Sequence, residues 1–176
     1  DPDKTLTANT FVPLILAEIC LRHHIKLVHL SSGCIFPNIP GPIKEEVIPM
    51  YFDLFYSRTK IYSEQVLKLL SLNKNILIIR TRIPLDDRPH PKNILTKLLS
   101  FKRIIDTPNS VSYLPDMMKA IKHLIAIDAR GIYNVVNKGG LRYPQLLDVY
   151  RKFVPDFHYK IMDVRDLPTP RTNLIL

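Results

Sequence analysis

The order of apolar and polar positions predicts helices that alternate with short buried strands. In residues 7–24, the apolar side chains of Leu14, Ala17 and Leu21 recur at the spacing of one helix face. The next segment, Lys26 to Ser31, is short and rich in branched residues, and it ends in small polar ones, so we expect a buried strand. Repeated glycine and proline in residues 33–55 indicate a loop.

The same alternation continues through the rest of the chain. A second helix is expected from Tyr56 to about Leu70, and the continuous apolar run Ile76–Arg82 indicates a second buried strand. The remaining expected elements are a short helix in NILTKLLSF, a helix in Pro115–Ile127, a strand in GIYNVVN, a helix in Tyr143–Phe153 and an extended tail from Pro155. Continuous apolar strands between helices predict an α/β fold with a parallel sheet covered on both faces.

Composition narrows the class of protein. The 176 residues can bury a core, and 46% hydrophobic with 23% charged residues is ordinary for a globular chain. We find no uninterrupted apolar run of the roughly 18 residues that a membrane span needs, and no signal peptide. Two cysteines, Cys20 and Cys34, are too few for a disulfide framework or a zinc cage, so a reducing cytoplasm is the default location.

The chain is basic, with a net charge of +9. Its lysines and arginines are scattered, which favours a solvated basic surface over a nucleic-acid interface. An anionic nucleotide as ligand remains compatible with this charge.

Two features bear on chemistry. Tyr56 and Lys60 are four residues apart on the expected second helix, so they share one face, and an ammonium near a phenol favours the phenolate. A tyrosine tuned in this way can exchange a proton with a substrate oxygen, although the same spacing is also found on ordinary helices. Ser32 follows the first strand, at the edge where parallel sheets bind ligands, and could bond the same oxygen.

The order of these features, with a strand ending in SSGCIF, an acidic loop, the YSRTK helix and the strand ILIIRTR, resembles the extended short-chain dehydrogenase/reductase family. The further stretches RTRIPL, HPKNILTKLL, TPNSVSYLPDM and GIYNVVNKG are similar to its 3,5-epimerase/4-reductases of UDP-rhamnose synthesis. The resemblance implies a Rossmann-like fold, NADPH or NADH as cofactor and a nucleotide-sugar substrate. It also implies that Ser32, Tyr56 and Lys60 are catalytic and that Tyr56 and Lys60 contact the cofactor.

The resemblance gives roles to other residues as well. Cys34 and Lys97 match the pair that would move protons during epimerisation, with Lys97 as the candidate for the charge that favours the thiolate. The alternatives are a small buried side chain for Cys34 and a solvated helix residue for Lys97. The remaining matches are Asn9 and Arg82 on the cofactor side, and Asn93, Asn109, Ser110 and Arg171 on the substrate side.

The chain also departs from the family pattern. Its five glycines form no G-x-x-G-x-x-G turn, so we expect an incomplete sheet without the first βαβ unit and weak NAD(P) binding by this chain alone. Residues 1–84 would be the later part of the NAD(P)-binding domain. Residues 85–176 would be mainly substrate-binding, with one strand near 131–137 returning to the sheet.

The alternatives left open are a 4-reductase without epimerase activity and a non-catalytic nucleotide-sugar-binding fragment or subunit. No metal, nucleic acid or membrane partner is expected. A homodimer, or pairing with a separate N-terminal half, is compatible with the sequence.

Overall fold

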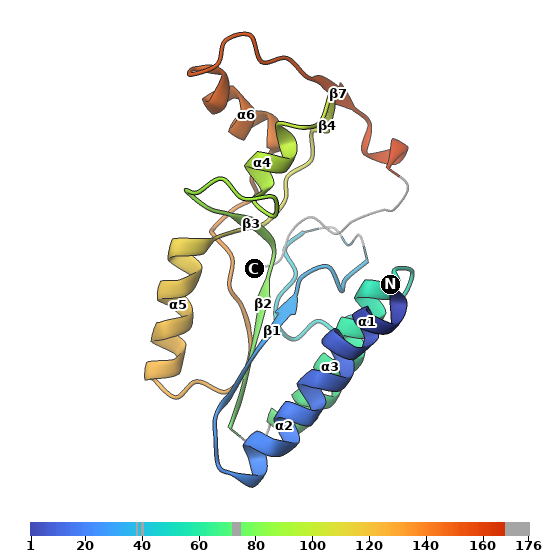
Figure 1. Cartoon of the computed structure of the whole chain (residues 1–176), viewed down its shortest axis with the longest axis vertical. Coiled ribbons are helices and arrows are strands. Elements are labelled where there is room, and N and C mark those ends of the chain that lie inside the picture. Colours follow the sequence, from blue (N-terminus) through green and yellow to red (C-terminus); the bar gives the residue numbers. More distant parts are fainter. Residues whose placement is uncertain (38, 40, 72–74, 168–176) are drawn as a thin grey trace.

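The described part of the chain is built around a parallel sheet with helices on both faces (Figure 1). The structure is a computed structural model, and it describes residues 1–37, 39, 41–71 and 75–167. Its largest sheet contains β1 (Leu27–Ser32), β2 (Ile76–Thr81) and β6 (Gly131–Asn134), in the order β1-β2-β6 and all parallel. The expected α/β fold with a parallel sheet is therefore confirmed.

Each face of this sheet has its own apolar core. The first face is covered by α2 (Val12–Arg22) and α3 (Phe55–Ser71), and the opposite face by α5 (Leu114–Ala126), as the two sides of Figure 1 show. β2 is buried on both faces because its alternate side chains point in opposite directions. On the α2 and α3 side, Ile76 and Ile78 pack with Ala17 and Leu67, and on the α5 side Leu77 and Ile79 pack with Ile121 and Ala129.

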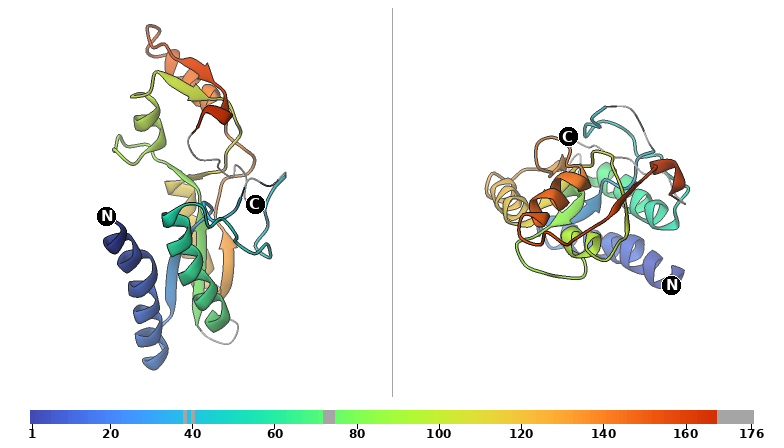
Figure 2. Two further views of the ribbon diagram at one scale, coloured as in Figure 1. Left: turned by 90° about the vertical axis from the view of Figure 1, so that its right-hand side faces the viewer. Right: turned by 90° about the horizontal axis from the view of Figure 1, so that it is seen from above.

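A smaller group of elements lies beyond the carboxyl ends of these strands, at the top of Figure 1 and of the left view in Figure 2. Its helices are α4 (Ile94–Leu98) and α6 (Tyr143–Arg151), which share a core of Leu98, Ile104 and Leu147. Its strands form two parallel pairs, β3 (Ile83–Leu85) with β5 (Val111–Tyr113) and β4 (Arg103–Ile105) with β7 (Lys160–Met162). A 3₁₀ turn follows at Val164–Asp166.

Most expected elements are present, with two differences. The tail from Pro155, expected to be extended throughout, contains β7 and the 3₁₀ turn. The short strands β3 and β4 were not anticipated, because three residues are too few for a recognisable apolar period.

The first helix is longer than its apolar period predicts. It starts at Pro2, where the Asp1 carboxylate accepts a hydrogen bond from the backbone N–H of Lys4, and runs through α1 (Pro2–Leu6) and a π-helical turn (Thr7–Phe11) into α2. Pro13 has no N–H to donate to the preceding turn, and the wider π turn just before it lets the helix continue.

By length and composition alone, the helix Pro2–Arg22 is apolar enough to cross a membrane. This helix contains no uninterrupted apolar run of that length, because charged residues interrupt it, but it is apolar on average. Core helices of globular proteins pass the same test, and one face of this helix, with Leu14, Ala17 and Leu21, packs into the core beside α3.

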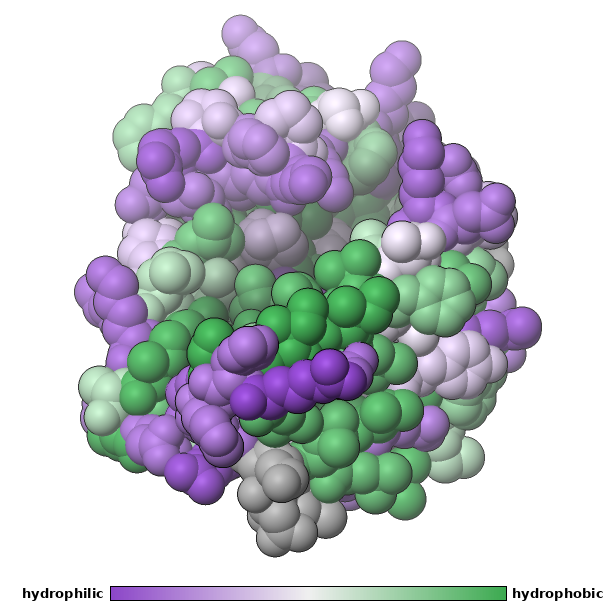
Figure 3. Space-filling model, turned by 60° about the horizontal axis from the view of Figure 1, so that its bottom comes forward, coloured by the Kyte–Doolittle hydropathy of each residue, from purple (hydrophilic) through white to green (hydrophobic). Residues whose placement is uncertain are grey.

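β1 forms one edge of the three-stranded sheet. Leu30, near its carboxyl end, is half exposed. Hydrophobic side chains also cover much of the lower side of the molecule, which Figure 3 brings forward. On α2 and the π turn before it, the exposed apolar side chains are Phe11, Val12, Ile15, Leu16 and Ile19.

Candidate active site

A cavity of about 880 Å³ lies between the carboxyl ends of β1 and β2 and the smaller group of elements. Parallel strands bring their carboxyl ends to one edge of a sheet, which is where open α/β sheets bind ligands. The polar residues that line this cavity are Ser31, Ser32, Cys34, Tyr56, Thr81, Arg82, Lys92, Lys97, Arg103, Asn109, Ser112 and Tyr143. Its other walls are mostly apolar and come from α4, β4, α5 and the residues around β7.

The side chains of Ser32 and Tyr56 both line this cavity, and Ser32 lies close enough to the phenol to act on its pKa. Ser32 is the last residue of β1, and its Oγ also accepts a hydrogen bond of 3.1 Å from the backbone N–H of Cys34. Tyr56 is in the first turn of α3, whose next residue, Ser57, donates a hydrogen bond of 2.6 Å to the Cys34 carbonyl. The turn after β1 and the start of α3 are thus tied together, which fixes the two hydroxyls side by side.

Burial raises the pKa of Tyr56, and the hydrogen bond from Ser32 offsets only part of this effect. The expectation from the spacing was the opposite, because Lys60 was expected to favour the phenolate. Lys60 is not among the groups that shift this pKa, and its ammonium instead donates a hydrogen bond of 3.1 Å to the Leu30 carbonyl of β1. Tyr56 is therefore a phenol across the neutral pH range, with a proton to donate.

Lys60 lies one turn beyond Tyr56 on α3, over the carboxyl half of β1. Burial lowers the pKa of its ammonium, and the carboxylate of Glu64 partly opposes this change. Its neighbour on β1, His29, is buried, and burial followed by the charge of Lys60 lowers the imidazole pKa to about 4. His29 is therefore neutral beside the ammonium at physiological pH.

The sulfur of Cys34 is held by a guanidinium. Nη1 of Arg82 donates to Cys34 Sγ at 2.7 Å, and Nη2 donates to Asn109 Oδ1 at 3.3 Å. Arg82 is buried, and its backbone N–H donates to Ser112 Oγ, which fixes the position of the residue just after β2. Cys34, Arg82 and Asn109 all line the cavity.

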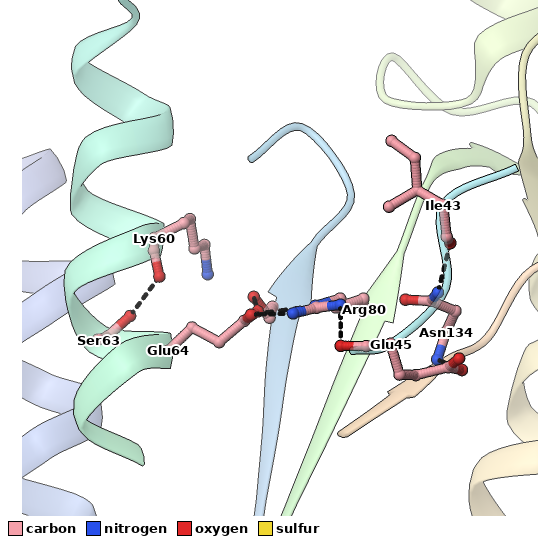
Figure 4. Close-up of polar contacts among 8 residues, drawn as sticks. Ile43, Glu45, Lys60, Ser63, Glu64, Arg80 and Asn134 are labelled. Atoms are coloured by element: carbon pink, nitrogen blue, oxygen red, sulfur yellow. Dashed lines mark hydrogen bonds and ion pairs between the residues drawn. The ribbon is translucent and has the colours of Figure 1, made fainter. Parts of the chain in front are cut away.

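A buried ion pair lies below these residues, between α3 and the sheet (Figure 4). Glu64 is one turn beyond Lys60, and its Oε1 is 2.6 Å from Nη2 of Arg80 on β2, while its Oε2 accepts a hydrogen bond of 2.5 Å from Ser31. The Arg80 guanidinium lies over the ring of Phe36, 5.0 Å from the ring centroid. It also donates to the Glu45 carbonyl at 3.2 Å.

Figure 4 shows that the same network continues to β6. The Glu45 carboxylate accepts a hydrogen bond of 2.8 Å from the backbone N–H of Asn134, whose side-chain amide donates to the Ile43 carbonyl at 3.0 Å. The described part of the loop between β1 and α3 is thus attached to all three strands of the main sheet.

Six of the residues expected from the sequence line the cavity, namely Ser32, Cys34, Tyr56, Arg82, Lys97 and Asn109. Lys60 is outside this lining, but its ammonium donates to the carbonyl of Leu30, which does line the cavity. Ser110 is fully buried next to Asn109.

The structure gives two other expected residues local partners away from the cavity. Asn9, expected on the cofactor side, lies within the π turn, and its amide donates to Thr59 Oγ1 on α3 at 3.2 Å. Asn93 is the N-cap of α4, with its amide bound to the carbonyls of Asp86 and Arg88. Arg171 lies outside the described residues.

The sequence reasoning missed the Glu64–Arg80 pair, although a signal was present. Arg80 interrupts an otherwise apolar buried strand, and a charge at such a position needs a partner. Glu64 continues the Tyr56 and Lys60 face by one more turn, which made it the nearest candidate.

The comparisons with known proteins agree with this geometry. Residues 1–85, which contain Ser32, Cys34, Tyr56, Lys60 and Arg82, match the NAD dependent epimerase/dehydratase family. The resemblance inferred from the sequence motifs is thereby confirmed.

The relatives are enzymes of rhamnose synthesis by name. The chain is 30% identical to the bifunctional dTDP-4-dehydrorhamnose 3,5-epimerase/dTDP-4-dehydrorhamnose reductase of Arabidopsis thaliana, over 97% of this chain and 60% of that protein. It is 28% identical to an Arabidopsis thaliana trifunctional UDP-glucose 4,6-dehydratase/UDP-4-keto-6-deoxy-D-glucose 3,5-epimerase/UDP-4-keto-L-rhamnose-reductase, of which it covers 27%. The chain thus spans about 60% or less of the length of these curated relatives.

Solved structures show the same fold. The L780 UDP-rhamnose synthase of Acanthamoeba polyphaga mimivirus superposes with a TM-score of 0.85 at 28% identity, over 96% of this chain and 62% of that one. The dTDP-4-dehydrorhamnose reductase of Bacillus anthracis, in complex with NADP, gives a TM-score of 0.81 at 19% identity, over 99% and 64%. The family assignment and these folds agree with a Rossmann-type NAD(P)-binding architecture.

Proposed function

We infer that the chain carries the catalytic residues of an NAD(P)H-dependent 3,5-epimerase/4-reductase that acts on a 4-keto-6-deoxy sugar nucleotide. The observation that carries this proposal is the meeting of the Ser32 and Tyr56 hydroxyls with the Cys34 thiol at one cavity. The names of the Arabidopsis thaliana relatives, which combine both activities, support the same assignment.

In the reduction step, Tyr56 donates its proton to the C4 oxygen of the sugar. Its raised pKa keeps the phenol protonated at neutral pH, and Ser32 bonds to the same oxygen and orients it. Because Ser32 and Tyr56 line the same part of the cavity, one substrate oxygen can accept a hydrogen bond from each of the two hydroxyls.

The residues present fit the nicotinamide end of NADPH or NADH. The Tyr56 hydroxyl and the Lys60 ammonium are donors at the carboxyl end of β1, beside the half-exposed Leu30. When bound, the cofactor supplies the hydride for C4. Lys60 would hold the nicotinamide ribose by exchanging its bond to the Leu30 carbonyl for one to a ribose hydroxyl. Asn9 supports this region through Thr59 of α3, and Arg82 contacts Cys34 in our assignment instead of the cofactor.

Epimerisation next to the C4 ketone needs a base that removes the C3 or C5 proton and an acid that returns one to the opposite face. Cys34 and Lys97 line the same cavity from opposite parts of the molecule, the turn after β1 and α4. We assign the base to the Cys34 thiolate and the acid to the Lys97 ammonium.

Residues 1–84 would thus carry the reaction, and residues 85–176 would mainly hold the nucleotide sugar. Asn109 and Lys97 face the cavity from the second part, and Ser110 and Asn93 support it from within. We place the protein in the cytoplasm, where its two free cysteines, Cys20 and Cys34, remain reduced.

The direct test uses a fusion of the chain to the part of the mimivirus protein that it does not span. With UDP-4-keto-6-deoxyglucose and NADPH, we expect NADPH oxidation and formation of a UDP-6-deoxy sugar epimerised at C3 and C5. Product with C4 reduced but C3 and C5 unchanged would support the 4-reductase alternative. Binding of the sugar nucleotide without NADPH oxidation would support the non-catalytic one.

A further inference from the structure

The buried guanidinium of Arg82 donates a hydrogen bond to the sulfur of Cys34. We propose that Arg82 is a positioning residue that stabilises the thiolate of Cys34. Arg82 would thus take the role that was expected from the sequence for Lys97 on α4. This inference rests on the proposed function, in which Cys34 acts as the base.

The geometry carries the proposal. Arg82 Nη1 donates to Cys34 Sγ at 2.7 Å, and the guanidinium has little freedom to leave because Asn109 binds Nη2 and Ser112 binds the backbone N–H. Arg82 is only 6% exposed, so its charge is poorly screened by water. A cation at this distance favours the anionic form of a thiol.

The surroundings of Cys34 add one more titratable group. Tyr56 interacts electrostatically with both Cys34 and Arg82, and it is a neutral phenol at neutral pH because its pKa is raised. Lys92, Lys97 and Arg103 line the same cavity from the smaller group of elements. Among these described residues, Arg82 is the one that donates a hydrogen bond to the Cys34 sulfur.

The Arg82 guanidinium also fits the change in charge that Cys34 would undergo as a base. The guanidinium holds the negative charge of the sulfur within the cavity, and the sulfur takes a proton from the sugar carbon to become a neutral thiol. Because Lys97 protonates the opposite face of the sugar carbon, the Cys34 thiol then gives its proton to solvent and Lys97 takes one back, so the charges of both groups are restored at each turnover.

The test reads the thiolate directly, without substrate or cofactor. In the Cys20→Ser chain, Cys34 is the only cysteine left, and its alkylation by iodoacetamide is followed by mass spectrometry from pH 5.5 to 10. Each rate is divided by the plateau reached at high pH, which removes differences in access. An unassisted thiol reacts at about 1% of its plateau rate at pH 6.5. We expect the folded Cys20→Ser chain to react at about 10% or more of its plateau.

Three variants in the Cys20→Ser background separate the causes. Arg82→Met should lower the relative rate at pH 6.5 by about tenfold, Arg82→Lys should retain most of it, and Lys97→Met should leave it unchanged. A relative rate of about 1% in the parent, or the same profile in a folded Arg82→Met chain, overturns the proposal. If Arg82→Met does not fold, the pH profiles of alkylation for the parent and for Arg82→Lys still test whether the Cys34 thiolate is stabilised. Failure of the NADPH assay leaves this measurement unaffected, so the two hypotheses fail separately.

Discussion

Glu64 and Arg80 form a buried ion pair directly under the candidate active site. Oε1 of Glu64 accepts hydrogen bonds from Nη2 and Nε of Arg80 at 2.6 and 3.0 Å, and both side chains are almost inaccessible to water. The pair joins α3 to β2, and through Ser31 it reaches the strand that ends in Ser32. The catalytic face of α3 is therefore fixed to the sheet by charge as well as by apolar packing.

Removal of one partner of this pair should be costly. Glu64→Gln leaves the Arg80 guanidinium buried without its counter-charge, and we expect a loss of about 3–5 kcal/mol in the free energy of unfolding. Urea unfolding followed by circular dichroism measures it. The matched control is Glu18→Gln, which removes an exposed pair with Arg22 and should cost about 0.5 kcal/mol or less. A similarly small loss for both variants would show that the Glu64–Arg80 pair does not stabilise the packing of α3 on β2.

His29 predicts a specific dependence of stability on pH. Its pKa is about 4 in the folded chain and 6.5 as the ordinary value, so the unfolded chain binds more protons between these limits. The contribution of His29 to the free energy of unfolding should therefore be fully present above pH 6.5. It should fall by on the order of 3 kcal/mol as the pH drops to 4.

The His29 contribution is measured as a difference between variants, because carboxylates also titrate in this range. Urea unfolding of His29→Gln at pH 7, 5.5 and 4 should show a smaller loss than the parent chain. His123→Gln, at an exposed position on α5, is the control and should follow the parent. Equal slopes for the parent and His29→Gln would mean that the imidazole is not held neutral by burial.

Tyr56→Phe tests the proton donor in the fusion described above. The change keeps the ring and removes the hydroxyl, so the rate of C4 reduction should fall by about 100- to 10,000-fold. Tyr62→Phe is the matched control, because Tyr62 is half exposed on the same helix and away from the cavity lining. Stopped-flow measurement of NADPH oxidation gives both rates. Reduction near the parental rate by Tyr56→Phe would remove Tyr56 from its assigned role.

Cys34→Ala separates epimerisation from reduction. In the same fusion we expect it to abolish deuterium incorporation from heavy water at C3 and C5, while C4 reduction of an already epimerised sugar continues. Lys97→Ala should behave in the same way, since it is assigned to the opposite face of the ring. Cys20→Ala and Lys102→Ala are controls outside the cavity lining. Deuterium exchange at the parental rate in Cys34→Ala would favour the 4-reductase alternative.

Local patterns were enough for the elements that bury apolar surface on a clear period. β1, α3, β2, α5 and α6 were all recognisable, because each has either a continuous apolar run or a helical repeat over several turns. The order of Ser32, Cys34, Tyr56 and Lys60 along the chain also pointed to one edge of the sheet. Short strands such as β3 and β4 gave no such signal, since their pairing depends on segments far away in sequence.

The class of fold, the family resemblance and the residue types available for catalysis could all be predicted from the amino-acid sequence. The electrostatic states of those residues depend on the three-dimensional arrangement of their neighbours. The spacing of Tyr56 and Lys60 predicted a lowered phenol pKa, whereas burial raises it and Lys60 binds the Leu30 carbonyl. Arg82 and Cys34 are far apart in sequence, and they meet because parallel pairing brings the ends of β1 and β2 together. Burial and charge contacts are sums over neighbours that the fold assembles, so no local pattern can contain them.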